Sequence, residues 1–462
     1  MSSRRVFGFS KPRVRTQACP CEVRRIAPPE RVRIPIALPG QPPLAPAVAV
    51  GDAVKLGQAI AATATASAVH ATVAGRVANI GVMHGTDGRE VHGIEIQAAG
   101  PQDWIEAKVL GILERTSWDD LTSTLVGLGA ASPWKPKAMQ ERMGPGELRP
   151  IHTIVIVGSE REPGLAVQCH YLTEGRQDLL DSLAVIRTLA GEGARILLLV
   201  PEAMRAGLGE EFGAIEVQPV TDRYPDNHWQ RLLARAAGVG HTNVARAREG
   251  GFLLMSAEEA ALAGRSLREG LPRTAKLLTV AGGPLAEPVT VETVLGAPIE
   301  HVLRELGFDV QEGDRVILGG LWHGHAQFDL QAPVTRTTDG LQVLSAGDVA
   351  RLEENPCINC GRCTSVCPVR IQVAVAARYA EFGLMDEAYD RGAHACIECG
   401  LCAHVCPARR PLLQYMRFAV LKHEDCLVRD SEGSGECLDC KLPTAHDLPS
   451  APRAESWTDD RS

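Results

Sequence analysis

Eight of the fourteen cysteines form two runs with identical spacing, in which two, two and three residues separate successive cysteines and a proline follows the last. The first run is Cys357, Cys360, Cys363 and Cys367, and the second is Cys396, Cys399, Cys402 and Cys406. Thiolates at such short intervals suit a metal centre whose iron corners lie close together, and this is the spacing that holds cubane iron–sulfur clusters. The sequence therefore predicts two 4Fe-4S clusters, with these eight cysteines as metal ligands.

The same spacing occurs in bacterial two-cluster ferredoxins, where the fourth cysteine of each run ligates the other cluster. We therefore expect two sets that cross over: Cys357, Cys360 and Cys363 with Cys406, and Cys396, Cys399 and Cys402 with Cys367. Gly361 and Gly400 relieve crowding where the backbone passes close to inorganic sulfide. Zinc bound by four thiolates is the alternative, and it is disfavoured because zinc sites do not need two identical runs each closed by proline.

The remaining cysteines give weaker signals. Cys437 and Cys440 form a short pair near Cys426 in a polar segment, where an extra metal site and solvated thiols both remain open. Cys169 is expected in a core, and Cys19 and Cys21 have no partner that the sequence identifies.

Composition limits the classes of protein to which the chain can belong. With 462 residues, 45% of them hydrophobic, it is long enough for three or four domains. A net charge of -8 argues against a general nucleic-acid binder. There is no apolar run of about 18 residues, and no apolar stretch follows the early arginines, so neither a membrane span nor a secretory signal is expected. We expect a cytoplasmic protein that contacts a membrane through a partner.

Changes in composition and hydrophobic pattern divide the chain into six predicted segments. Short apolar stretches with glycines resemble a carrier-type β-module that lacks the modifiable lysine, strands alternating with helical patterns predict a parallel sheet, and a further run of strands predicts a β-grasp element. The predicted segments are an irregular arm (1–30), a barrel-sandwich hybrid (31–100), an α/β domain (101–272), a β-grasp module with linker (273–345), a double-cluster domain (346–425) and a polar tail (426–462). His70 is expected to be a packed core residue.

This domain order resembles the RnfC family, whose members belong to the Rnf complex, an ion-translocating complex that links ferredoxin, NADH and, in some versions, other carriers. The resemblance extends from Arg33 to about Lys422, and besides the cysteines it rests on three segments: Val69–Val77, Leu318–Gly320 and Asp329–Gly340. It implies a multidomain α/β fold with a β barrel-sandwich hybrid, a βα flavoprotein-like domain, a β-grasp module of the SLBB type and a two-cluster ferredoxin-like helical domain.

The resemblance also implies a function. The chain would be a peripheral subunit that passes electrons through its clusters between a soluble redox protein and the other subunits of a membrane-bound complex, at the cytoplasmic face of the inner membrane. No catalytic residue is assigned, because such a subunit is not a complete enzyme. The alternatives are a soluble flavoprotein of the cobalamin-reductase type and a scaffold with structural clusters. The donor, the acceptor, the direction of flow and the coupled ion stay open.

In that family the middle domain is similar to the NADH- and FMN-binding subunit of complex I, and its glycine-rich loop corresponds to residues 126–137. Gly127, Gly129, Pro133 and Lys137 match the loop, whereas Ala130 replaces a third glycine.

Two further blocks of that family pattern also depart from it. Glu160, Glu162 and Pro163 are retained, but Val157 stands where a flavin-contacting asparagine is expected. The block Phe252–Glu258 lacks its paired asparagines. We therefore expect the domain to keep its fold with FMN and NADH binding weakened or lost, and assign no cofactor-binding residue. The alternative is that the family's site tolerates the variation.

Overall fold

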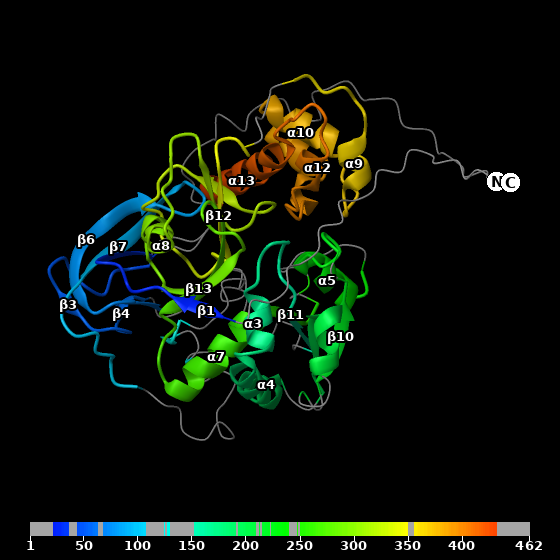
Figure 1. Cartoon of the computed structure of the whole chain (residues 1–462). Coiled ribbons are helices and arrows are strands. Elements are labelled where there is room, and N and C mark those ends of the chain that lie inside the picture. The colour runs from blue at the N-terminus through cyan, green and yellow to red at the C-terminus, as the bar shows by residue number, and fades with distance from the viewer. Residues whose placement is uncertain are drawn as a thin grey trace. The chain divides into compact units, whose positions relative to one another are not determined.

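The computed structural model describes residues 22–36, 44–62, 68–107, 124, 127–129, 152–190, 193–208, 212, 215–221, 223–239, 247, 250–349 and 355–431. These residues belong to two compact units, one ending at residue 349 and the other beginning at residue 355 (Figure 1). The predicted arm is described only from residue 22, and most of the predicted tail lies outside the described residues, as do Cys19, Cys21, Cys437 and Cys440.

A small β-module opens the first unit. Its four-stranded sheet has the order β2-β7-β6-β3, with β2 at Arg31–Pro35, β3 at Ala53–Val54, β6 at Gly75–His84 and β7 at Glu90–Ala98. A two-stranded sheet pairs β4 (Ala59–Ala61) with β5 (Val69–His70). Alternate residues of the longer strands point inward, so that Val32, Ile34, Ile94 and Ile96 form a core. His70 is buried beside this core, as predicted, and burial lowers its pKa to about 4.

A parallel four-stranded sheet follows, with the order β10-β9-β8-β11. The strands are β8 (Thr153–Val157), β9 (Arg195–Pro201), β10 (Glu216–Val220) and β11 (Phe252–Ser256). Ile154, Ile156 and Leu198 pack with α3 (Gln168–Leu172), α4 (Arg176–Ala190) and α7 (Ala257–Glu269). Val155 and Leu197 point the other way, toward α5 (Trp229–Ala236). Helices on both faces explain why these strands read as continuous apolar runs, and the predicted parallel sheet is confirmed.

A six-stranded mixed sheet completes the first unit, with the order β1-β13-β12-β16-β14-β15. Its strands are β1 (Val23–Arg25), β12 (Ala275–Gly282), β13 (Val289–Val294), β14 (Arg315–Leu318), β15 (His325–Gln327) and β16 (Gly340–Leu344). One face packs on α8 (Ile299–Glu305) through Leu278, Val291, Val302 and Leu341. Strand β1 lies within the segment predicted as an irregular arm, parallel to β13.

The second unit is helical. It comprises α9 (Arg362–Val366), α10 (Val373–Glu381), α11 (Met385–Asp390), the 3-10 turn η3 (Ala393–Ala395), α12 (Leu401–His404) and α13 (Leu412–Ser431). Its core is built mainly of alanines with Ile371, Leu412 and Met416. The chain between the cysteine runs forms two helices, α10 and α11, because Gly383 adopts a left-handed conformation (φ +78°) between them. In the described part of the chain, no helix combines the length and apolarity needed to cross a membrane.

Candidate iron–sulfur centre

The two cysteine runs share one backbone conformation, repeated 39 residues further along the chain. Gly361 and Gly400 are both left-handed, with φ of +71° and +72°, and each precedes a short helix that carries the third cysteine of its run. Asn359 and Glu398 are also equivalent, each with a φ of 55°. Left-handed residues turn the chain sharply, which lets cysteines only three positions apart face a common centre. The local sequence thus forms the same cysteine-bearing loop twice, and we call each of these two loops a nest.

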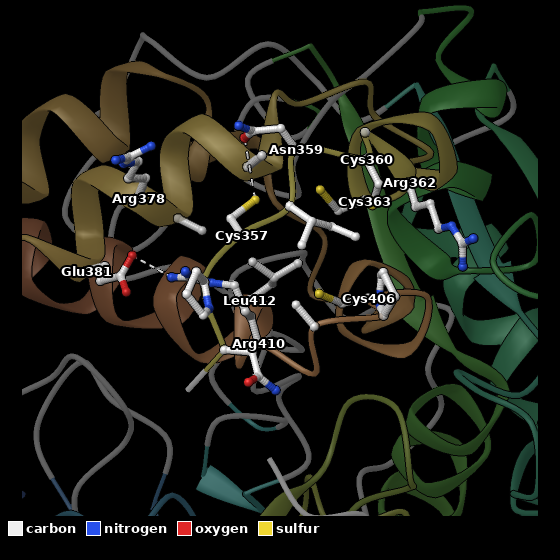
Figure 2. A pocket seen from close by; sticks show the side chains of 18 of the residues that line it. Cys357, Asn359, Cys360, Arg362, Cys363, Arg378, Glu381, Cys406, Arg410 and Leu412 are labelled. Atoms are coloured by element: carbon white, nitrogen blue, oxygen red, sulfur yellow. Dashed lines mark hydrogen bonds and ion pairs between the residues drawn. The ribbon is translucent and has the colours of Figure 1, made fainter. Parts of the chain in front are cut away.

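Four cysteines surround the first cavity, which has a volume of about 460 Å3. Cys357, Cys360 and Cys363 come from the first run and Cys406 from the second. Figure 2 shows these side chains around one space, with Arg378, Glu381 and Arg410 beside them. This is the first of the two sets that the sequence predicts to share a cluster.

The second cavity is smaller, about 20 Å3, and has the complementary lining. Cys396, Cys399 and Cys402 come from the second run and Cys367 from the first, and apolar side chains such as Leu413 and Met416 close the space around them. Each cavity is therefore lined by three cysteines of one run and the fourth of the other. The structure brings together the two predicted sets, and their role as ligands stays a prediction.

The chemistry of these linings fits an iron–sulfur cluster. Both sets offer sulfur donors alone, which is the ligand type that such clusters take. Burial raises the pKa of the Cys396 thiol to about 12, so that a thiolate there is favoured by the positive charge of a bound metal. The backbone N–H of Glu398 donates to Cys396 Sγ at 3.4 Å, a hydrogen bond that stabilises a thiolate.

The grouping of side chains that could bind a metal ion bears on the zinc alternative. Within the described ranges, no three side chains of His, Cys, Asp or Glu are close enough together to hold one metal ion. A structural zinc site needs four donors converging at about 2.0–2.3 Å from a single ion. Each cavity lining offers four cysteines without such a converging group, and the choice of a 4Fe-4S cluster over zinc stays a prediction from the cysteine spacing.

The second predicted site, in the α/β domain, is described only in part. Gly127 and Gly129 are described, whereas Ala130, Pro133 and Lys137 lie outside the described residues. Gly129 is left-handed (φ +63°), and a Cβ built there would lie 2.5 Å from Arg336 Nη2 and 2.9 Å from the carbonyl oxygen of Ala68. The close packing of this glycine is therefore against the chain's own residues.

The two retained glutamates are buried and bonded to backbone. Glu160 accepts a hydrogen bond from the N–H of Cys169 at 3.0 Å, and Glu162 accepts from the N–H groups of Trp322 and His323, both at 2.8 Å. Burial is the main cause that raises the pKa of each carboxyl to about 7. Glu160 thus stabilises the start of α3, and Glu162 stabilises the loop at Trp322 and His323.

The residues at the two substituted blocks also serve the fold. Val157 is fully buried in β8, and Leu254 lies in the same core. Ser256 caps α7: its Oγ accepts from the N–H of Glu259 at 3.0 Å, while the Glu259 carboxylate accepts from the Ser256 N–H at 2.9 Å. Cys169 is buried, as predicted.

Sequence reasoning missed a buried ionic network between α7 and the six-stranded sheet. Lys276 has no exposed surface and pairs with Glu258 and with Asp339, the latter at 2.8 Å. Arg273 also pairs with Glu258 at 2.8 Å. The signal was present in the sequence, because a lysine interrupts the apolar strand Ala275–Gly282. An isolated buried charge is costly, so such a lysine indicates a partner carboxylate.

Comparison with known proteins gives two domain matches. The model of the RnfC barrel sandwich hybrid domain matches residues 7–100, and the model of a 4Fe-4S dicluster domain matches residues 350–407. The second match implies two 4Fe-4S clusters and includes all eight cysteines. These two segments lie at opposite ends of the region that the sequence predicted to resemble an RnfC protein.

Full-length relatives agree with these matches. The chain is 29% identical over 380 residues to the C subunit of the Na+-translocating ferredoxin:NAD+ oxidoreductase complex of Acetobacterium woodii, covering 79% of this chain and 84% of the relative. It is 30% identical over 389 residues to the C subunit of the ion-translocating oxidoreductase complex of Pseudomonas aeruginosa, covering 77% of this chain but only 47% of that longer relative. The C subunit of the proton-translocating ferredoxin:NAD+ oxidoreductase complex of Clostridium ljungdahlii is 26% identical over 381 residues, with 79% and 81% covered. The chain belongs to the RnfC family.

Proposed function

We propose that this chain is the electron-transferring C subunit of an Rnf-type ion-translocating oxidoreductase complex. It would pass single electrons through two 4Fe-4S clusters between a soluble redox protein and the membrane subunits, at the cytoplasmic face of the inner membrane. The observation that carries the proposal is the pair of cavities, each lined by four cysteines, in a chain of the RnfC family. The names of its relatives specify sodium ions in one case and protons in another, so no coupled ion is proposed.

The proposed ligands are the eight cysteines in their crossed sets. When bound, a 4Fe-4S cluster accepts and releases one electron at a time. The chain's own contribution is to hold the thiolates, to donate backbone N–H groups such as that of Glu398 to sulfur, and to exclude water from the second cavity with Leu413 and Met416. The crossed lining also keeps the two centres within one small helical unit.

We further propose that the α/β domain binds neither FMN nor NADH, and that electrons reach the clusters from a protein partner. Three observations support this. Val157 and Leu254 are core residues, Ser256 is committed to a helix cap, and both oxygens of the retained Glu162 lie against backbone of the loop at Gly320–His323. The assignment of the parallel sheet as flavoprotein-like and of the mixed sheet as a β-grasp module is part of the same proposal.

The test is a metal and cofactor analysis of protein purified without oxygen from its native host. We expect about eight iron and eight sulfide per chain, and an electron paramagnetic resonance (EPR) spectrum of two interacting centres after dithionite reduction. We expect no stoichiometric FMN and no reduction by NADH alone. Two zinc ions without iron would refute the cluster assignment. Clusters that dithionite never reduces would favour a structural scaffold, and bound FMN or reduction by NADH would restore the flavin-linked role.

A further inference from the structure

The two halves of the cluster unit have the same backbone but differ in exposure. Ile358 and Ile397 occupy the same position of the two runs, yet Ile358 is 66% exposed and Ile397 only 3%. Cys360 is exposed, whereas its counterpart Cys399 is buried. Since the local conformations match, the difference comes from the surrounding chain, which covers the second nest and leaves the first nest open.

The two halves also differ in charge. The described lining of the first cavity includes Arg362, Arg378 and Arg410 and one carboxylate, Glu381, which is paired with the largely buried Arg410. Position 362 is an arginine where the second run has the fully buried Leu401. Among the described residues that line the second cavity, none is charged. The mouth of the first cavity is therefore a positive surface beside exposed cysteines.

An apolar patch completes this surface. Phe382 follows α10 and is 66% exposed, as is Ile358. The guanidinium carbon of Arg378 lies 6.0 Å from the centre of the Phe382 ring, so the cation and the apolar side chain are presented together. Apolar residues that desolvate at the centre, with charges around them that steer the approach, are the usual composition of a protein docking site.

We propose that Ile358, Arg362, Arg378 and Phe382 form a docking surface for a small acidic electron-transfer protein. The occupant is acidic because the surface carries an excess of arginine, and it is a redox protein because electron transfer requires close approach to a centre and the first nest is the exposed one. A patch of this kind suits a transient, salt-sensitive complex of small area. This inference rests on the proposed electron-transfer function and adds where the partner binds.

The test measures binding, so that it does not depend on turnover. The full-length, cluster-loaded chain is titrated without oxygen by calorimetry with an acidic two-cluster bacterial ferredoxin, at low and at high salt. The test variant is Arg378→Glu. The matched control is Arg391→Glu, because Arg391 is also exposed, lies 6.0 Å from the ring of Tyr379, and is outside both cavity linings as described. A second test variant, Phe382→Ala, removes apolar surface without changing charge.

We expect Arg378→Glu to weaken binding about tenfold at low salt, with the control unchanged and the difference reduced at high salt. Phe382→Ala should weaken binding at both salt concentrations. Equal losses in Arg378→Glu and Arg391→Glu would overturn the proposal, as would tighter binding of a basic cytochrome than of the ferredoxin. If Arg378→Glu loses iron, Arg378→Gln is the deciding variant, with a smaller loss of affinity expected and an unchanged affinity counting against the docking surface.

The iron content and the EPR spectrum separate this inference from the proposed function. Clusters that reduce normally in a wild-type chain that does not bind the ferredoxin would refute the docking surface alone. A chain that binds the ferredoxin but whose clusters never reduce would instead refute electron transfer.

Discussion

Cys363 and Cys367 lie four positions apart in the same run but line different cavities. Replacing each by alanine therefore tests whether the cysteines that line a cavity are also the ligands of the cluster in that cavity. We expect Cys363→Ala to damage the cluster shared with Cys406, and Cys367→Ala to damage the cluster held by the second run. Both predictions follow from which cysteines surround each cavity.

The expected loss of iron follows from the number of ligands that each variant keeps. Each variant keeps one complete set of four cysteines, so the iron content should fall from about eight to about four per chain and the interaction between centres should disappear from the EPR spectrum. Truncation of one buried sulfur should itself cost about 1 kcal/mol of folding free energy, which is too little to unfold the unit. Loss of iron then reports ligation rather than misfolding.

Iron and sulfide analysis with EPR of the dithionite-reduced protein is the assay. A third variant, Cys402→Ala, supplies the comparison, because Cys402 lines the same cavity as Cys367. The residual spectrum of Cys367→Ala should match that of Cys402→Ala and differ from that of Cys363→Ala. If Cys367→Ala instead matched Cys363→Ala, each run would hold its own cluster, and the reasoning from the cavity linings would be refuted.

Three further predictions concern the first unit. A Cβ at Gly320 would overlap the carboxylate of Glu162, so Gly320→Ala should break its backbone hydrogen bonds and cost about 2–4 kcal/mol in urea unfolding, whereas an unchanged midpoint would contradict this packing. Because burial raises the pKa of Glu162 to about 7, its contribution to stability is present below its unfolded pKa and is lost as the pH rises through about 7. The free energy of unfolding of the wild type should therefore fall by up to about 3 kcal/mol relative to that of Glu162→Gln between about pH 5 and pH 8. A difference between the two proteins that stays constant with pH would refute this. Lys276→Met removes the buried cation that pairs with both Glu258 and Asp339, leaving them with Arg273 and, at 3.8 Å, Arg161, and should lower the free energy of unfolding by about 3–5 kcal/mol. A variant as stable as wild type in the same unfolding assay would show that the network is dispensable.

Local features of the sequence were enough to predict the cysteine nests. Their spacing fixes which side chains converge, and the parallel strands were visible as apolar runs for the same reason. Long-range features were not visible. The pairing of Val23 with Thr290 joins segments far apart in the chain, so a short polar stretch became strand β1 where an irregular arm was expected.

The contrast between the two runs shows why the rest could not be predicted. Ile358 and Ile397 are the same residue in the same motif, and only the packing around them makes one exposed and the other buried. The break at Gly383 was likewise hidden inside a helical composition. Sequence pattern indicates which residues can act together, whereas solvent access depends on the completed fold.

Each cavity takes its fourth cysteine from the other repeat, and this exchange has a consequence for how the unit is assembled. With the proposed ligands, inserting the first cluster fixes the positions of Cys363 and Cys406, and through their runs it orders Cys367 and Cys402 for the second. The conformational entropy of arranging the second nest is then already lost, so the second insertion is more favourable than the first. The coupling is reciprocal. Maturation of the wild-type unit should therefore be cooperative, with the second cluster inserted more readily than the first.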